Sequence, residues 1–245
     1  MTIRTITAIA LGFLLSFSIS VEGAKGGKRS TAVILTLTND ANCIAEDQTT
    51  GGPADLNLNG DCVAGGVAII TATPLTLVAQ QISIEGVGNN DGITFTISGT
   101  DADGKSRYTS EALTGSNAGT ATSVQYYTTI TNIAASGAVT GDVEVGWLSA
   151  NGGVTETLVP DLQGYGAEMS ITVDVTGTVP YSIEHTAQNM PSKIEPLWFN
   201  TVDLTTKTAD AEGNILVAVG GVRAKCTTAT CVVNLMIFQA KLGRR

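Results

Sequence analysis

Apolar and polar residues alternate through most of the segment 82–146, and the alternation stops only at turns rich in glycine, asparagine and aspartate. Ile93, Phe95 and Ile97, for example, are separated by threonines. A period of two residues predicts β-strands that bury one face. The Asp-Gly pair that ends the stretch 101–104 is typical of a hairpin turn. This region is therefore expected to form antiparallel strands joined by tight turns.

The second half of the chain repeats this pattern. Ile171, Val173 and Val175 alternate with polar residues, and the strand-like run at 180–185 has a proline at its start, where a missing N–H is tolerated. No helical stripe of useful length follows the N-terminal apolar run. The expected fold class is all-β, with two antiparallel β-sandwich or jelly-roll-like units behind an apolar N-terminal segment.

Changes in the pattern divide the chain into four parts, with a boundary at the glycine-rich stretch 149–155. The expected parts are an apolar N-terminal segment (1–24), a linker, strand and cysteine-bracketed loop (25–74), a first β-sandwich unit (75–150) and a second β-sandwich unit (151–245).

The N-terminal segment has a short apolar run, residues 9–21, behind Arg4. A positive start, a short apolar core and small residues after it are typical of a secretory signal peptide. An uncleaved apolar arm used in assembly is the alternative. The run is shorter than the roughly 20 apolar residues that a membrane-spanning helix needs, so no stable membrane span is expected.

Composition and charge narrow the choice of partners. Hydrophobic residues make up 43% of the chain and charged residues 14%, and the net charge is −9. A chain this acidic is not expected to bind nucleic acid, because phosphate binding needs clustered Lys and Arg. The basic residues that do cluster lie near the two ends and are either solvated termini or a contact for an acidic partner, such as a neighbouring copy. They are Lys25, Lys28, Arg29, Lys241, Arg244 and Arg245.

Four cysteines fall into two pairs. Cys43 and Cys62 bracket a polar insert, and Cys226 and Cys231 bracket four residues between two strand-like runs. An even count with neither a CxxC motif nor a nearby histidine favours two disulfides over a metal site. Disulfides persist in an oxidising medium, outside the cell or on a released particle. Four reduced thiols are the alternative.

One motif has the spacing of a cation site. Asp55, Asn57, Asn59 and Asp61 place oxygen-bearing side chains at alternate positions around a turn glycine, as in the first half of a calcium loop. The bidentate Glu of such loops is replaced by Gly66. The alternative is an exposed Asn/Gly loop closed by a disulfide. Calcium is the one cofactor that the sequence suggests.

The sequence contains no recognisable catalytic motif, and we expect no enzymatic activity. His185, the only histidine, shares a strand face with Tyr181 and Ile183 and is expected to be half-buried and hydrogen-bonded. A G-x-S-x-G elbow, an H-E-x-x-H helix and a phosphate-binding glycine loop are all missing from the sequence.

Several strand-and-turn motifs follow one another along residues 75–240. They are GITFTISGTDADG, GSNAGT, QYYTTITNI and GDVEVGW in the first half, then PYSIEHT, WFNTVDLTTKTA, GGVRAK and IFQA. This succession resembles that of β-rich virion structural proteins of tailed bacteriophages, of the head-decoration, head–tail or tail accessory type.

The resemblance implies a non-enzymatic structural component of the virion. Such a component assembles through repeated oligomeric β contacts with copies of itself and with other virion structural proteins. The expected location is then the extracellular particle. A secreted or cell-surface bacterial β protein, such as a filament subunit or an adhesin, is the alternative, because the N-terminal segment resembles an export signal.

Overall fold

A computed structural model describes the chain as a set of short β-strands and one 3-10 helix, η1 (Val202–Leu204). The described residues are 27–34, 40–70, 78–106, 111–115, 119–148, 151–163, 165–188, 190, 194–227 and 232–241. Every strand pair among them is antiparallel, so the predicted all-β fold class is confirmed. The predicted N-terminal segment 1–24 lies outside the described residues.

The first sandwich consists of two sheets. One sheet has the order β10 (Thr120–Thr122), β7 (Ser83–Gly86), β12 (Val143–Trp147) and β2 (Asp40–Gln48). The other has the order β4 (Val63–Ala64), β5 (Val67–Ile69), β11 (Thr129–Ala135), β8 (Thr94–Thr100) and β9 (Glu111–Thr114), and β3 (Ala54–Asp55) also pairs with β11. Buried side chains from both sheets form one core, which includes Phe95, Tyr127 and Trp147.

The second sandwich also has two sheets. The one that we call the terminal sheet, because it holds the first and last strands, has the order β1 (Gly27–Ile34), β19 (Val232–Lys241), β14 (Tyr165–Thr176) and β17 (Ala211–Ile215). The one that we call the junction sheet has the order β16 (Phe199–Asn200), β15 (Tyr181–Thr186), β18 (Gly221–Cys226), β13 (Gly153–Thr155) and β6 (Val78–Gln80). Their core is mostly aliphatic and includes Ile171, Val173 and Leu235.

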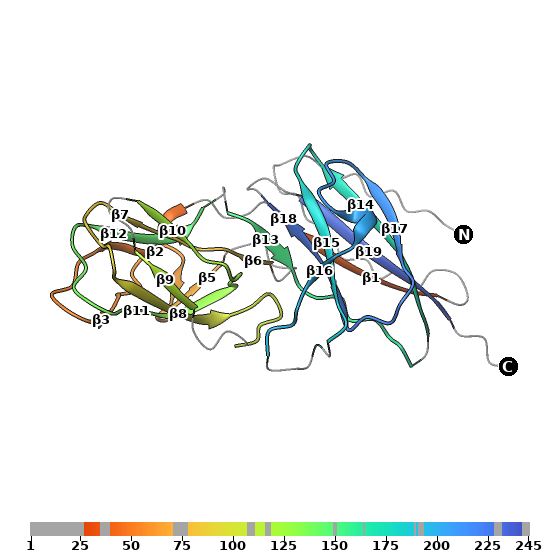
Figure 1. Cartoon of the computed structure of the whole chain (residues 1–245), viewed down its shortest axis with the longest axis horizontal. Helices are drawn as coiled ribbons and strands as arrows, with labels where there is room; N and C mark the ends of the chain where they lie inside the picture. The colour runs from red at the N-terminus through yellow and green to blue at the C-terminus, as the bar shows by residue number, and fades with distance from the viewer. Residues whose placement is uncertain are drawn as a thin grey trace, which may run out of the picture.

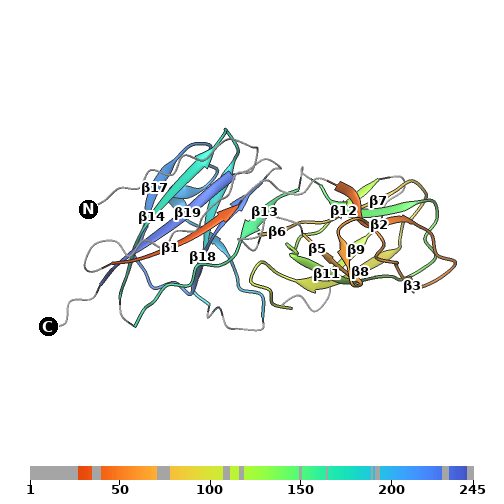
Figure 2. The same ribbon diagram turned by 180° about the vertical axis from the view of Figure 1, so that it is seen from behind.

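The pairing of strands does not follow their order in the chain. β1 precedes the whole first sandwich but pairs with β19 of the second, from Gly27 opposite Ala240 to Ile34 opposite Val233. β6 lies between β5 and β7 in sequence and joins the junction sheet through β13. The chain therefore crosses between the sandwiches several times. Figures 1 and 2 show the two sandwiches next to each other along the long axis, with β6 and β13 between them.

Two stretches differ from the expected local structure. Residues 27–30, expected in a linker, are the first half of β1. The polar insert that follows was expected to lack strands, but β2 runs through it and pairs with β12. Cys43, Ile44 and Ala45 are consecutive and all fully buried, and the register with β12 shifts twice. A strand with such bulges has no two-residue period, which explains why the pattern did not predict it.

Candidate functional site

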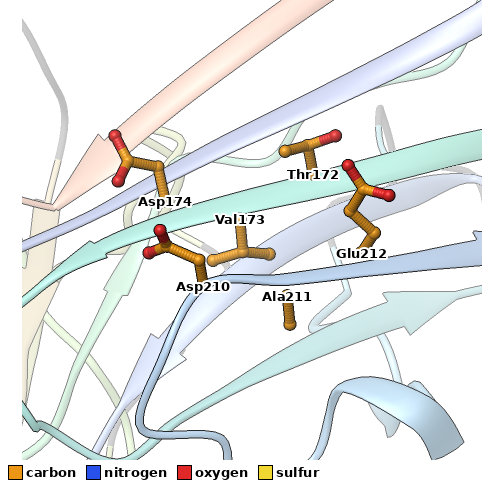
Figure 3. Close-up of a pocket in the computed structure, with 6 residues that line it drawn as sticks. All are labelled: Thr172, Val173, Asp174, Asp210, Ala211 and Glu212. Carbon is orange, nitrogen blue, oxygen red and sulfur yellow. The ribbon is translucent and has the colours of Figure 1, made fainter.

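The terminal sheet carries an acidic hollow at its β17 edge. The hollow has a volume of about 480 Å³ and is lined by β14, β17 and the residue before β17. Three of its side chains are carboxylates, those of Asp174, Asp210 and Glu212 (Figure 3). Glu212 stands opposite Thr172 in the β14–β17 register. A second hollow of about 340 Å³ continues along the same two strands and shares Thr172 and Glu212.

Local packing holds this edge in place. The Asp210 carboxylate accepts a hydrogen bond of 2.8 Å from the Val175 backbone N–H, which ties the start of β17 to β14. A Cβ at Gly213 would lie 2.9 Å from Leu204 Cδ1, so the glycine lets η1 pack directly beneath β17. Leu204 is fully buried. The edge is therefore a supported strand whose acidic side chains face outward.

The acidic edge also affects the interior next to it. The Tyr181 hydroxyl donates a hydrogen bond of 2.8 Å to the Ala209 carbonyl oxygen. Burial, followed by the negative charge of Asp210, raises the pKa of Tyr181 to about 12. Tyr181 is therefore a hydrogen-bond donor throughout the physiological pH range. Within the described residues, His, Cys, Asp and Glu form no group of three or more that could hold a metal ion.

A second cluster of charges lies between the sandwiches, on the outer face of the junction sheet. Arg223 Nε on β18 donates a hydrogen bond of 2.9 Å to Glu184 Oε2 on β15, and Arg223 Nη2 lies 2.8 Å from the same oxygen. Lys225 Nζ lies 3.2 Å from the other carboxylate oxygen, Oε1. The side chains of Arg223 and Glu184 are 9% and 8% exposed. A buried ion pair of this kind is costly to break from one side, because the remaining charge is left without a partner.

Aromatic rings complete this cluster. The Arg223 guanidinium carbon lies 4.0 Å from the centre of the Trp198 ring and 5.8 Å from that of Tyr126. Tyr126 belongs to the first sandwich, so the cation of one sandwich is covered by a ring of the other. Burial lowers the pKa of Lys225, but the charges of Tyr126 and Glu184 and the hydrogen bonds to them raise it further, and the net shift is upward. Lys225 therefore stays charged in the cluster.

The Asp-Gly turn predicted at 101–104 is a further link between the sandwiches. The Asp101 carboxylate accepts hydrogen bonds from the Asp103 and Lys105 backbone N–H groups, and Gly104 has a φ of 67°. This geometry turns the Asp103 carboxylate toward the second sandwich. There it accepts two hydrogen bonds from Thr157, one of 2.8 Å from the backbone N–H and one of 3.0 Å from the hydroxyl.

The residues of the predicted calcium loop bond to different neighbours. The Asp55 carboxylate accepts a hydrogen bond from Asn132, and the Asn57 N–H donates to the side-chain oxygen of Gln48. Asn59 Oδ1 accepts hydrogen bonds from the Glu46 backbone N–H at 2.9 Å and from Gln48 Nε2 at 3.1 Å. Asp61 lies in a turn directly before Cys62. The calcium site stays a prediction.

The cysteines agree with the predicted pairing as far as the structure describes them. Cys43 and Cys62 form a disulfide with Cα atoms 4.9 Å apart, which confirms the first predicted bond. It joins β2 to the turn before β4, and Cys43 is fully buried. Cys226 is also disulfide-bonded, and its predicted partner, Cys231, lies outside the described residues.

His185 has the environment that its position predicts. It is partly buried, its Nδ1 lies 3.1 Å from the Thr201 hydroxyl, and its ring centre is 6.3 Å from that of Phe199. Burial lowers the pKa of His185, so the neutral form is favoured.

The sequence pattern did not predict the Glu184–Arg223 pair. The feature that could have indicated this pair is the presence of two basic residues, Arg223 and Lys225, at alternate positions of a strand whose other residues are apolar.

These observations define a class of protein: an all-β, disulfide-bearing chain built of antiparallel sheets. No helix within the described ranges is long and apolar enough to cross a membrane. Comparison with protein-family models and with curated proteins gave no match.

Proposed function

We propose that this protein is a non-enzymatic structural component of a bacteriophage virion, at the capsid surface or at the head–tail or tail region. In this role it assembles through repeated β contacts with copies of itself and with other virion proteins. The observation that carries the proposal is the way in which the two sandwiches are fixed to each other. A particle component has to transmit load between neighbours, and a fixed pair of domains does so better than two domains on a flexible linker.

Three kinds of contact support a fixed junction. Strand β6 pairs with both sandwiches. Its residue Gln80 pairs with Gly153 of β13 in the second sandwich and forms a β-bridge with Tyr127 of the first. Asp103 accepts two hydrogen bonds from Thr157. The ring of Tyr126 covers the charge of Arg223. Relative motion is the default expectation for two domains of one chain, and these contacts act against it.

The resemblance to tailed-phage virion proteins adds support from a separate direction. The turn GTDADG is part of the motif succession on which the resemblance rests, and Asp103 in that turn bonds to the second sandwich. The turn GTDADG, which predicts a hairpin, thus also joins the two sandwiches through Asp103.

The test is to purify particles from a culture that carries this gene, on a density gradient, and to analyse them by intact-mass spectrometry. The proposal predicts that the protein sediments with the particles at a constant ratio to the major capsid protein. Recovery only from the periplasm or the medium, with a mature N-terminus near Ala24 or Lys25, would contradict it.

A secreted or cell-surface β protein, such as a filament subunit or an adhesin, is the second candidate. The Cys43–Cys62 disulfide favours it, because such bonds persist in oxidising compartments outside the cytoplasm. The same fractionation separates the two candidates. Surface labelling of intact cells that carry no particles would favour the second.

Calcium binding at Asp55, Asn57, Asn59 and Asp61 is a proposal of its own. Its test is the melting temperature with calcium and with an excess of chelator. Calcium in the loop predicts a lower melting temperature with chelator. An unchanged melting temperature, and no change when Asp61 is replaced by Asn, would remove the site.

A further inference from the structure

The two edge strands of the terminal sheet are β1 and β17. Within the described residues, β1 pairs with β19 alone and β17 pairs with β14 alone. Each edge strand therefore presents backbone N–H and C=O groups along one side, which is the usual template for adding another strand. β1 has eight residues and β17 has five, so either edge can accept a strand of ordinary length.

The strand directions of this sheet allow it to continue into a second copy. All three pairs, β1–β19, β19–β14 and β14–β17, are antiparallel. With four strands that alternate in direction, β1 and β17 run in opposite senses. A second copy in the same orientation therefore places its β1 antiparallel to β17 of the first copy. The alternation continues across the contact without turning either copy over.

The two edges also carry opposite charge. The β17 edge has the exposed Glu212, with Asp210 before it and Asp174 on the neighbouring strand. Strand β1 contains Arg29, which stands opposite Phe238 in the register. Phe238 and Glu212 are both exposed. Opposite charges on one face of adjacent strands stabilise their pairing, and like charges destabilise it.

Exposed apolar side chains lie next to the acidic edge. Leu216 and Val217, directly after β17, are 71% and 60% exposed, and Val202 in η1, which packs against β17, is 89% exposed. Apolar side chains beside an open strand edge give a contact some area to bury in addition to its hydrogen bonds. These apolar neighbours distinguish the β17 edge from an isolated cluster of surface carboxylates.

We propose that a second copy of this chain binds here, with β17 of one copy adding to β1 of the next. The contact is head to tail, so each copy keeps one free edge, and the product is a ring or an open filament. Pairing of two β17 edges, or of two β1 edges, would instead bring like charges together. The inference rests on the proposed function and names the surfaces through which copies of the chain assemble.

The test uses two charge-reversal variants of the full chain. The acidic-edge variant is Asp174→Lys with Glu212→Lys, which leaves the Asp210–Val175 hydrogen bond in place. The basic-edge variant is Arg29→Glu with Thr31→Glu, at two alternate positions of β1. Sedimentation velocity over a concentration series is expected to show growing oligomers for the wild type and association weakened about tenfold or more for each variant alone. An equimolar mixture of the two variants should regain assembly, because each then meets an edge of opposite charge.

The control matched to the acidic-edge variant is Asp91→Lys with Asp142→Lys, which makes the same change in net charge as that variant on exposed residues of the first sandwich. It should assemble like the wild type. The proposal is overturned if the wild type stays monomeric, if oligomers stop at a dimer, or if the mixture of variants does not regain assembly while both variants keep the circular dichroism of the wild type.

These outcomes separate the inference from the proposed function. If both variants are incorporated into particles as the wild type is, the edge contact is wrong although the protein is a virion component. If the wild type assembles through these edges but is never found in particles, the edge contact holds and the virion role is wrong.

Discussion

The two sandwiches are held together in different ways. The first has a core with large aromatic side chains, including Trp147 and Tyr127, and a disulfide between Cys43 and Cys62. The second has a mostly aliphatic core and draws its edge strand β1 from the far end of the chain. It also carries a buried ion pair on the face that meets the first sandwich. The second sandwich also has a disulfide-bonded cysteine, Cys226 on β18. The comparison therefore indicates that the two sandwiches differ in their cores, and that the second relies in addition on an edge strand distant in sequence and on a buried ion pair.

The largest expected effect is at the ion pair of the second sandwich. Replacing Glu184 by Ala leaves the Arg223 charge buried without its partner, and we expect this to lower the free energy of unfolding by about 3–5 kcal/mol. Urea unfolding followed by tryptophan fluorescence measures it. The control is the double variant Glu184→Met with Arg223→Met, which removes both charges and should lose much less stability. Equal losses in the two variants would contradict the role of the pair.

The disulfide of the first sandwich should come next. Replacing Cys43 and Cys62 by Ala removes a cross-link between residues 19 positions apart and is expected to cost about 3 kcal/mol on the loop-entropy model. Differential scanning calorimetry should show the first sandwich unfolding at a lower temperature. A loss confined to the second sandwich would reverse the comparison. Intact mass with and without reductant checks that the bond is formed.

A smaller effect is expected where the sandwiches meet. Replacing Thr157 by Val removes the hydroxyl that donates to Asp103 and keeps the shape of the side chain, and the expected loss is about 1–2 kcal/mol. The backbone N–H of Thr157 still donates to Asp103 in this variant. Thr176→Val, at an exposed position of β14, is the matched control and should change stability little. Limited proteolysis should cut the Thr157 variant faster near 149–152 if the contact fixes the junction.

The smallest expected effect is a pH dependence carried by His185. Because burial lowers the folded-state pKa below the ordinary value of 6.5, the unfolded chain binds the proton more tightly. The stability that the neutral ring contributes is complete above pH 6.5 and is lost as the pH falls through 6.5 toward the folded-state pKa. The melting temperature should therefore decline over this range. His185→Asn, which retains a group able to bond to Thr201, should flatten the decline, and an unchanged profile would contradict the assignment.

Carboxyl groups with a raised pKa act in the opposite direction. Burial, then the charge of Asp103, raises the pKa of Glu156 above 4.5. The folded state therefore binds this proton more tightly than the unfolded chain does, and the stability that this contributes is lost as the pH rises above 4.5 through the folded-state pKa. A decline from pH 6.5 downward would therefore not come from this group, and the His185→Asn variant tests whether it comes from His185.

The all-β class, the Asp-Gly turn and the Cys43–Cys62 bond could be predicted from the sequence because each depends on neighbours close in the chain. The pairing of β1 with β19 could not, because a two-residue period tells which residues share a face but not which strand lies alongside. The Glu184–Arg223 pair was missed for the same reason. It exists only in the register that puts β15 next to β18.

The edge contact adds a second difference between the sandwiches, since the second has the oppositely charged open edges and would carry the assembly. Cross-linking of assemblies of the purified Arg29→Lys variant with a zero-length carboxylate–amine reagent tests this most directly, because the variant has an amine at the β1 position opposite the exposed Phe238. The two edges of the four-stranded sheet are separated by about 14 Å of strand spacing, too far for such a reagent to bridge within one copy. The account predicts a cross-link between residue 29 of one copy and Glu212 of the next. Assemblies that show other carboxylate–amine cross-links but none between residue 29 and the β17 edge would contradict it.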